Sequence, residues 1–415
     1  GMKKLSSFIF IIFISIFTSL SFAADWLDKE VPSFCQAYKS YFDHVGIACE
    51  YGIAGWKTKE LATETVQKGI QKHANTITAG NEFKPQFIMA WWGNNPKVTN
   101  ITFKATNGVT IKTPELNGFG SVDAMLQICK ERGLQMRGHV LVWHSQTEEA
   151  FFRQDYDKSK PYVSKEEMTA RQEWYIKTVL EHIQNWEKVN NEGKKIIWCW
   201  DVVNEAVGDG GPELRKESSW FNIYKNYDFV VNAFRFANKY ASKDTLLCYN
   251  DYNCNIPEKR QGMIKVLDNI MAARNDKTLP TRIDAMGMQA HIGKYVKVSD
   301  YEKAIQTFLA KGLDVQITEL DIATEEKYDE DELYRVYKDY FTMFIKNRKI
   351  KGKNGITSIT IWGINDEATW LNSPSQIKWH KNTIQYPLLF QLKGNSYQPK
   401  KAFYGVIEAA KEYKN

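Results

Sequence analysis

Residues 196–205 read Ile-Ile-Trp-Cys-Trp-Asp-Val-Val-Asn-Glu, and residues 314–321 read Asp-Val-Gln-Ile-Thr-Glu-Leu-Asp. Each stretch is a short, largely apolar run with an acidic side chain near its end. Such runs are typical of parallel strands that are covered on both faces, because these strands lack the alternation of a half-exposed strand. The two stretches therefore predict buried parallel strands that carry Glu205 and Glu319 toward their C-terminal ends.

The same pattern recurs along the whole chain. Together with these two stretches it predicts eight strands, at residues 45–49, 76–81, 134–143, 196–205, 245–253, 285–292, 314–322 and 358–366. Helical spacing separates them, most clearly over residues 122–132, 164–186, 227–240, 260–273 and 301–310. Eight buried strands that alternate with helices favour an α/β fold, a single (β/α)8 barrel, over an open sheet.

Unusual polar and aromatic side chains gather at the C-terminal ends of these strands, where such a barrel carries its active site. They are Asn81, His139, Trp143, Asn204, Glu205, Asp251, Gln289, His291, Glu319, Asp321, Trp362 and Asp366. Two carboxylates on opposite walls can cleave a glycosidic bond, one as proton donor and the other as nucleophile or base. A single strand-end glutamate is as often a paired structural group, but the neighbouring amides and His291 favour a catalytic site.

One insertion interrupts the alternation after the second expected strand. Residues 96–118 contain two alternating apolar runs joined by Asn107-Gly108. Asn-Gly between alternating runs is typical of a tight β-hairpin. We therefore expect an extra hairpin after strand two, on the active-site face.

The N-terminal segment has the order of a secretory signal peptide. Lys3 and Lys4 precede an apolar run over residues 5–20, and small residues follow at 23 and 24. The run is short for a membrane span and lacks a basic stop-transfer cluster. We expect residues 2–23 to be a signal peptide and residues 24–415 to form one catalytic barrel. The protein would be secreted or periplasmic, with no membrane association after cleavage.

Composition argues against a nucleic-acid partner and for a carbohydrate ligand. The formal charge of +6 falls to +4 when Lys3 and Lys4 are removed with the signal peptide, and no arginine-rich run is evident. The chain has 13 Trp and 21 Tyr, whose flat faces suit stacking on sugar rings. Many of these aromatic residues must also fill a large core.

The six cysteines permit disulfides without dictating them. Cys248 with Cys254, and Cys35 with Cys49, are the pairs that their positions allow, whereas the other two cysteines lie in apolar contexts typical of buried free thiols. No cysteine or histidine has metal-ligand spacing. We expect no metal and no cofactor.

Six motifs, in order along the chain, resemble those of the family 10 glycoside hydrolases, the xylanase family. They are Arg137-Gly-His139-Val-Leu-Val-Trp143-His144-Ser-Gln146, Trp200-Asp-Val-Val-Asn204-Glu205-Ala, Asn250-Asp251-Tyr252-Asn253, Gly287-Met-Gln289-Ala-His291, Thr318-Glu319-Leu-Asp321 and Trp362-Gly-Ile-Asn-Asp366-Glu-Ala-Thr-Trp370-Leu. The resemblance covers essentially the whole chain after the signal peptide. It implies a monomeric, cofactor-free retaining endo-β-1,4-xylanase that hydrolyses xylan through a covalent glycosyl-enzyme intermediate.

The resemblance also implies roles for individual residues. Glu205 would be the general acid/base and Glu319 the nucleophile, with their carboxyl groups about 5–5.5 Å apart. Asn204 would donate to the sugar 2-hydroxyl, while His291, backed by Asp321, would keep Glu319 ionised. The implied substrate-binding residues are Asn81, Lys84, His139, Trp143, Gln146, Tyr252, Gln289, Trp362 and Trp370. We expect a raised pKa for Glu205, because a charged neighbouring carboxylate favours its protonated form.

Three further residues also have a purely structural interpretation. His144 is equally compatible with a hydrogen-bonded histidine of the barrel and with a contact to the sugar. Tyr252 is equally compatible with plain packing and with stacking on a sugar ring. Trp200, inside an apolar strand, is expected in the core.

The chain departs from the family pattern near the second strand. Residues 79–85 read Ala-Gly-Asn-Glu-Phe-Lys-Pro, where the family usually reads Pro-Glu-Asn-x-Met-Lys-Trp. Asn81 and Lys84 keep the implied contacts to the second sugar on the non-reducing side, but Gly80 replaces the glutamate that would share that sugar. One hypothesis is that Gly80 opens space for a decorated xylose, with the 96–118 hairpin as a new wall. The alternative is drift in a loop without contacts to substrate.

Two other functions stay open at this point. A β-1,4-glucanase or a mixed xylan/glucan hydrolase would differ only in admitting a hydroxymethyl group, which the pocket walls decide. A non-catalytic glycan-binding barrel is disfavoured because Glu205 and Glu319 are both present.

Overall fold

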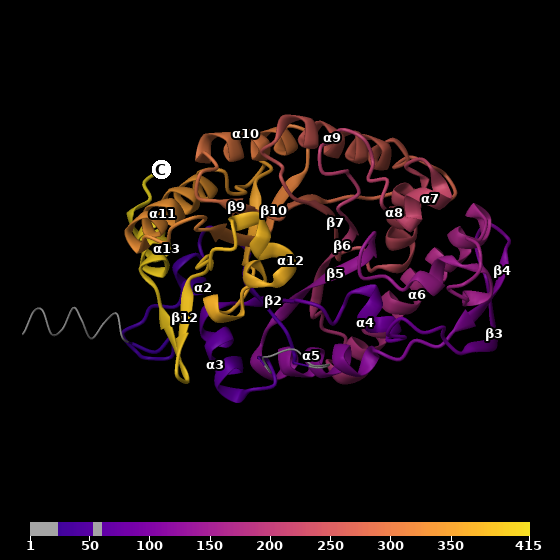
Figure 1. Ribbon diagram of the computed structural model, residues 1–415, viewed down its shortest axis with the longest axis horizontal. Helices are drawn as coiled ribbons and strands as arrows, with labels where there is room; N and C mark the ends of the chain where they lie inside the picture. The colour runs from indigo at the N-terminus through magenta and orange to yellow at the C-terminus, as the bar shows by residue number, and fades with distance from the viewer. Residues whose placement is uncertain (1–23, 53–59) are drawn as a thin grey trace, which may run out of the picture.

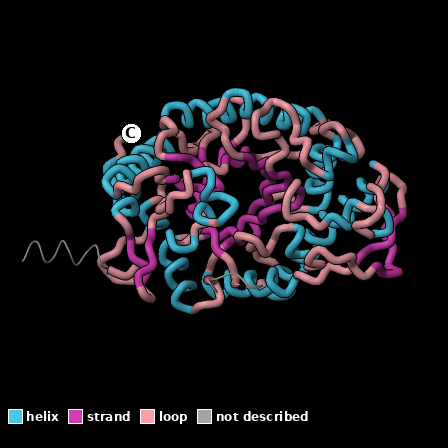
Figure 2. The backbone as a smooth tube through the Cα atoms, viewed as in Figure 1, coloured by secondary structure: helices cyan, strands magenta, loops and turns pink. Residues whose placement is uncertain are grey.

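The computed structural model describes residues 24–52 and 60–415, so the expected signal peptide at 2–23 lies outside the described residues. Eight parallel strands form a closed barrel, which confirms the predicted fold class. The barrel strands are β1 (His44–Cys49), β2 (Thr76–Ala79), β5 (Gln135–Trp143), β6 (Ile197–Asn204), β7 (Leu246–Asp251), β8 (Ala285–Met288), β10 (Asp314–Ala323) and β11 (Ile356–Ile361). They lie at the centre of the molecule with helices around them (Figure 2).

The barrel closes where its first and last strands meet. In β1, Ile47 pairs with Ile77 of β2 on one side and with Ile361 of β11 on the other, and β11 pairs in turn with β10. These strands are buried almost throughout, because one face fills the barrel and the other meets the helices. A short strand, β9 (His291–Gly293), runs beside the end of β10 and sets His291 opposite Asp321.

Helices cover the outside of the barrel (Figure 1). The longer ones are α3 (Glu64–His73), α5 (Phe119–Arg132), α6 (Lys165–Asn190), α8 (Asp228–Tyr240), α9 (Pro257–Ala272), α10 (Val298–Leu309), α11 (Glu330–Lys346) and α13 (Lys401–Glu412). Side-chain caps explain where two of them begin, since Ser164 accepts from the Glu167 N–H in α6 and Asp329 accepts from two N–H groups in α11. No helix of the described residues is long and apolar enough to cross a membrane.

The smaller elements complete the fold. They are α2 (Phe34–Ala37), α4 (Pro85–Met89), α7 (Ser219–Tyr224), α12 (Pro374–Ile377) and a hairpin of β12 (Phe390–Lys393) and β13 (Ser396–Pro399). The sequence did not predict the β12–β13 hairpin. It holds the N-terminal segment, because the Trp26 ring stacks on Tyr397 with centroids 4.6 Å apart and meets Phe390 edge-on at 5.4 Å.

The inserted hairpin is confirmed as β3 (Val98–Lys104) and β4 (Thr110–Pro114), but its place differs from the expectation. Its turn docks on the outer helices, where Glu173 of α6 accepts from the Thr106 N–H at 2.7 Å and Lys239 of α8 donates to the Thr106 hydroxyl at 3.0 Å. It lies beyond α6 at one end of the molecule, outside the ring of strands (Figure 1). The prediction that it walls the sugar site is therefore wrong.

A buried ion pair lies inside the barrel. Arg137 of β5 donates through Nη1 and Nη2 to the Asp201 carboxylate of β6 at 3.0 and 2.7 Å, and its Nε donates to Gln316 Oε1 of β10 at 2.9 Å. Burial raises the pKa of Asp201, but Arg137 and His139 outweigh it and lower that pKa to about 2. Through these contacts Arg137 links β5 to the neighbouring strand β6 and to β10 across the barrel.

All six cysteines, which lie in the described residues, are free thiols. The predicted pairs are wrong because their members lie in different packing environments. Cys248 packs with Trp198 and Cys199, whereas Cys254 belongs to the main core cluster. Cys35 contacts the Lys72 carbonyl at 3.6 Å, while Cys49 is buried in β1.

We expect Arg137→Ala to lower the free energy of unfolding by about 3–5 kcal/mol, because it leaves Asp201 buried without its cation. Urea denaturation at neutral pH measures this change. Lys68→Ala, which breaks the exposed pair with Glu64, is the control and should cost less than about 0.5 kcal/mol. Equal effects of the two substitutions would contradict a structural role for the buried pair.

Candidate active site

Glu205 follows the last residue of β6 and has a φ of 58°, which is uncommon outside glycine. Its backbone is fixed on both sides, since its N–H donates to the Asn250 carbonyl at 2.8 Å and its carbonyl accepts from Arg215 Nε at 3.2 Å. Neighbouring strands and the following loop thus hold Glu205 in this conformation at the barrel mouth.

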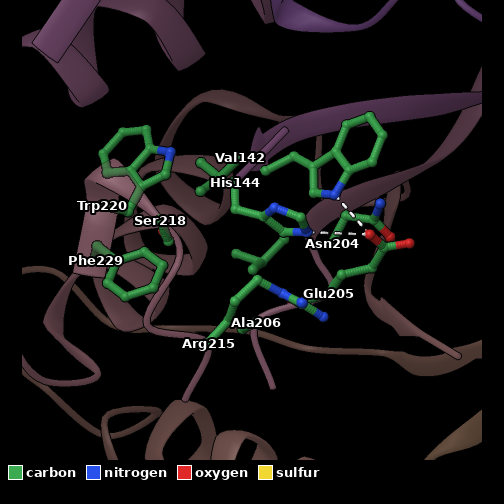
Figure 3. Close-up of a pocket in the computed structure, with 11 residues that line it drawn as sticks. Val142, His144, Asn204, Glu205, Ala206, Arg215, Ser218, Trp220 and Phe229 are labelled. Atoms are coloured by element: carbon green, nitrogen blue, oxygen red, sulfur yellow. Dashed lines mark hydrogen bonds and ion pairs between the residues drawn. The ribbon is translucent and has the colours of Figure 1, made fainter. Parts of the chain in front are cut away.

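Three donors surround the carboxylate of Glu205. Oε1 accepts from Trp143 Nε1 at 2.8 Å and lies 3.3 Å from His144 Nε2, while Oε2 accepts from Gln289 Nε2 at 2.8 Å. Figure 3 shows the His144 ring directed at this carboxylate. This contact supports the interpretation of His144 as a hydrogen-bonded histidine and leaves its contact with a sugar as a prediction.

The pKa of Glu205 differs from the expectation. Burial raises it, but the hydrogen bonds from His144, Gln289 and Trp143 outweigh burial and lower the pKa to about 2. The prediction of a raised pKa is therefore wrong for the ligand-free site. All three donors favour the ionised form, so protonation of Glu205 requires that some of these contacts weaken.

Glu319 lies within β10 and is held by two other strands. Its Oε1 is 2.9 Å from His291 Nε2, and its Oε2 accepts from Asn250 Nδ2 at 2.8 Å. The other ring nitrogen of His291 is 2.9 Å from Asp321 Oδ1. Both ring nitrogens of His291 therefore face carboxylate acceptors, which suits the protonated ring.

The pKa of His291 follows from this position. Burial lowers it, but the charge of Asp321 and the hydrogen bonds to Asp321 and Glu319 raise it to about 10. His291 is thus an imidazolium between two carboxylates at neutral pH. Its positive charge lies 2.9 Å from the Glu319 carboxylate and forms an ion pair with it.

Amide side chains bridge the two glutamates. The Asn204 Oδ1 atom accepts from Asn250 Nδ2 at 2.9 Å and from Gln289 Nε2 at 3.2 Å. Each of these two amides also donates to one of the glutamates. Asn250 donates to Glu319, and Gln289 donates to Glu205. The Asn204 oxygen therefore joins the two amides that hold Glu205 and Glu319.

A second polar group extends from Trp143 toward β2. Lys84 Nζ donates to Asn81 Oδ1 and to Gln146 Oε1, both at 2.9 Å, and lies 5.1 Å from the centroid of the Trp143 ring. Burial lowers the pKa of Lys84, and the charges of Glu319, Glu50 and Glu205 oppose that effect. Asn81, Lys84 and Gln146 therefore form one connected group beside the two catalytic candidates.

Aromatic and imidazole rings line the same mouth. Trp370 Nε1 donates to Asp321 Oδ2 at 2.8 Å, and its ring centroid is 4.7 Å from that of His291. The Trp362 ring meets His139 and His291 edge-on at 5.6 and 6.2 Å. His139 is buried, with Nδ1 2.8 Å from Asp201.

Tyr252 lies next to Glu205 rather than within this group. Arg215, which contacts the Glu205 carbonyl, also donates through Nη2 to the Tyr252 hydroxyl at 2.7 Å, and Tyr252 donates to Asp209. A hollow adjoins this network, lined by His144, residues 208–211 and residues 213–217. The structure places the Tyr252 hydroxyl in a polar network with Arg215 and Asp209, and the sugar contact expected for Tyr252 stays a prediction.

Gly80 does not open an empty space. A Cβ atom added at Gly80 would lie 3.0 Å from the Cγ atom of Glu50, the residue that follows β1. The volume beside Gly80 is thus already filled by another carboxylate side chain. The hypothesis of room for a decorated xylose is wrong for this reason.

Within the described residues, no group of three His, Cys, Asp or Glu side chains is arranged to hold a metal ion. The chemistry available at this site is proton transfer and attack by a carboxylate. Two ionisable glutamates at the mouth of a closed barrel, bridged by amides, are the arrangement that glycosidic cleavage requires.

Most of the chain matches a known family. A model described as glycosyl hydrolase family 10 matches residues 33–409. The chain belongs to this family. The resemblance drawn from the six motifs is therefore confirmed.

Several relatives are similar over much of the chain. Endo-1,4-beta-xylanase B of Butyrivibrio fibrisolvens is 34% identical over 379 residues, covering 90% of this chain and 52% of the relative. A putative endo-1,4-beta-xylanase of Caldicellulosiruptor saccharolyticus is 37% identical over 311 residues, covering 71% of this chain and 91% of the relative. The chain thus spans about half the length of the Butyrivibrio relative.

Solved structures agree with this picture. The endo-1,4-beta-xylanase from Caldicellulosiruptor owensensis has a TM-score of 0.69 and 31% identity, covering 91% of this chain and 99% of that one. A Clostridium thermocellum xylanase solved with xylohexaose has a TM-score of 0.71 and 29% identity, covering 92% of this chain and 68% of that one. Family 10 barrels of this kind thus share the architecture of the present chain.

Sequence reasoning missed three residues that organise the site. Asn250 was noted only as part of a motif, although its amide contacts Asn204 and Glu319. Asp201 gave a usable signal, because a carboxylate inside an apolar strand needs a buried partner. Arg215 gave none, since it lies in a polar loop and reaches Glu205 only through the folded chain.

We expect the His291 ring to stay doubly protonated through neutral pH and to titrate near pH 10, and Asp321→Asn to lower its pKa. The contacts that raise the His291 pKa stabilise the folded state. This stabilisation is complete below the pKa of the unfolded chain, about 6.5, and is lost as pH rises toward 10. Nitrogen-15 NMR of the ring measures both effects. A ring that titrates near 6.5 in the unaltered protein would contradict the imidazolium assignment.

Proposed function

We propose that this protein is a secreted, retaining endo-β-1,4-xylanase. The observation that carries the proposal is the pair of glutamates, Glu205 and Glu319, held at the mouth of the barrel by a shared bridge of amides. The relatives described above, which are named as xylanases, support xylan as the substrate. The order of residues 2–23 supports secretion.

In the proposed mechanism, Glu319 is the nucleophile. Its carboxylate attacks the anomeric carbon and forms the glycosyl-enzyme ester, while the C–O bond to the leaving sugar breaks. The imidazolium of His291 and the amide of Asn250 orient the Glu319 carboxylate before the attack. Asn204 Nδ2 would donate to the sugar 2-hydroxyl, a contact that tightens as positive charge develops on the ring.

Glu205 is the proposed acid/base. It gives its proton to the leaving oxygen and, in the second half of the reaction, takes a proton from the water that hydrolyses the ester. Because its donors lower its pKa in the ligand-free site, substrate has to weaken contacts such as that of His144. A sugar placed between these groups would do so, which ties protonation to substrate binding.

The proposal is tested with xylohexaose. We expect internal cleavage and a β-anomer as the first product, because double displacement retains the configuration. Proton NMR of the fresh products identifies the anomer, and chromatography identifies the cut. Cellohexaose is the matched control, since it adds a hydroxymethyl group to every ring. An initial α-anomer would overturn the retaining mechanism, and faster cleavage of cellohexaose would favour the β-glucanase alternative.

Single substitutions test the two roles. Glu319→Ala should abolish hydrolysis of every glycoside, a loss of about 10⁴-fold or more, because the ester cannot form. Glu205→Ala should lower xylan hydrolysis by about 10²–10⁴-fold. It should spare the cleavage of an aryl xylobioside, whose leaving group needs no proton. Azide should partly rescue turnover of this aryl substrate by the Glu205→Ala variant. If both folded variants lose the aryl substrate equally, the assignment of roles is wrong.

A further inference from the structure

Glu50 lies at the end of the barrel where the proposed active site is. It follows β1 directly, and the last pair between β1 and β2 joins Cys49 to Ala79. The next residues of the two strands, Glu50 and Gly80, are therefore neighbours, and the Gly80 N–H donates to the Cys49 carbonyl at 2.9 Å.

The Glu50 side chain lies over Gly80. A Cβ atom at position 80 would be 3.0 Å from Glu50 Cγ and 3.4 Å from Glu50 Oε1, closer than most Cβ atoms approach other groups. Any larger residue at position 80 would push this side chain away. Glycine here makes room for a carboxylate that comes from the adjacent strand.

Contacts connect Glu50 to the catalytic candidates. Asn81 Nδ2 donates to Glu50 Oε1, and Asn81 Oδ1 accepts from Lys84. Lys84 lies against the Trp143 ring, and Trp143 donates to Glu205. Glu50 therefore stands at the far end of a row of polar groups that begins at Glu205.

The row lies close to both glutamates, since the charges of Glu319 and Glu205 both act on Lys84. The contacts that the family resemblance implies for Asn81 and Lys84 are to the second sugar on the non-reducing side. Glu50, which accepts from Asn81, would therefore lie at that sugar. The hollow beside His144 and the 208–217 loop lies beyond Glu205, where the leaving sugar would go.

The carboxylate of Glu50 is only partly exposed. Among the described residues, Asn81 is the one whose side chain donates to it. Burial, followed by the charge of Glu82, raises the pKa of Glu50 to about 7, and Lys84 and Asn81 act in the opposite direction. Glu60 contacts only its backbone, accepting from the Glu50 N–H at 2.9 Å. A half-buried carboxylate with spare acceptor capacity costs free energy unless a ligand uses it.

We propose that Glu50 binds substrate, accepting hydroxyl hydrogen bonds from the second sugar on the non-reducing side of the cleaved bond, and that Gly80 is required to admit its side chain. This inference rests on the proposed function. It assigns a binding role to the residue that follows β1, which lies 31 positions before Asn81 in the chain.

Two aryl glycosides test it. A p-nitrophenyl β-xyloside reaches only the first sugar site, whereas the corresponding β-xylobioside also reaches Glu50. Glu50→Gln keeps the shape and removes the charge. At pH 8.5, above the Glu50 pKa of about 7, the ratio of kcat/KM for the xylobioside to that for the xyloside should therefore fall about ten-fold or more. Glu60→Gln, in the same cluster but turned to the backbone, is the matched control and should leave the ratio unchanged.

An exchange of positions tests the role of Gly80. Gly80→Glu alone should lower the ratio, because the new side chain collides with Glu50. The double substitution Glu50→Gly with Gly80→Glu should give a higher ratio than Glu50→Gly alone, since a carboxylate returns to the same volume. Thermal unfolding of each variant shows whether it is folded.

The outcomes separate the inference from the function on which it rests. If the unaltered protein hydrolyses neither glycoside nor xylohexaose, the proposed function fails. If it hydrolyses them, but Glu50→Gln leaves the ratio unchanged or changes it no more than Glu60→Gln does, the inference about Glu50 is overturned.

Discussion

Two carboxylates lie at the mouth of this barrel, largely withdrawn from water, and the free-energy cost of burying them is the constraint around which the site is arranged. In such surroundings a carboxylate needs donors or an opposite charge to offset its lost hydration. Glu319 has both, from Asn250 and the His291 imidazolium, whereas Glu205 is held by Trp143, His144 and Gln289. The donors come from separate strands, so the closed barrel itself is what keeps the charges in place.

Each donor is in turn oriented by another contact. Asp321 fixes the orientation of the His291 ring, and Trp370 holds Asp321. Thr318 donates to the Asn250 oxygen and so decides which end of that amide faces Glu319. Support of this kind lowers the cost of reorganisation when charge develops during a reaction. The low pKa of Glu205 is a result of the same arrangement, since donors that hold a carboxylate also oppose its protonation.

The region around Gly80 shows how two neighbouring strands share one volume. Position 80, just after β2, has no side chain, and the side chain of Glu50, just after β1, occupies the adjoining volume. Parallel strands place equivalent ends side by side, so one strand can supply a side chain that its neighbour lacks. The hairpin of β3 and β4, although it follows the same strand, is separate from this arrangement because it docks on α6 and α8.

The sequence by itself determined the barrel, the inserted hairpin and the positions of the strand-end polar residues, because apolar runs and turn residues act locally along the chain. Only the tertiary structure decided which of these residues touch. Asn81 donates to Glu50, which lies 31 residues before it in the sequence, and Gln289 donates to Glu205, which lies 84 residues before it. The free thiols, the docking of the hairpin and the lowered pKa of Glu205 likewise depend on neighbours distant in the sequence. Local pattern carries no information about such pairs, since closure of the barrel brings them together.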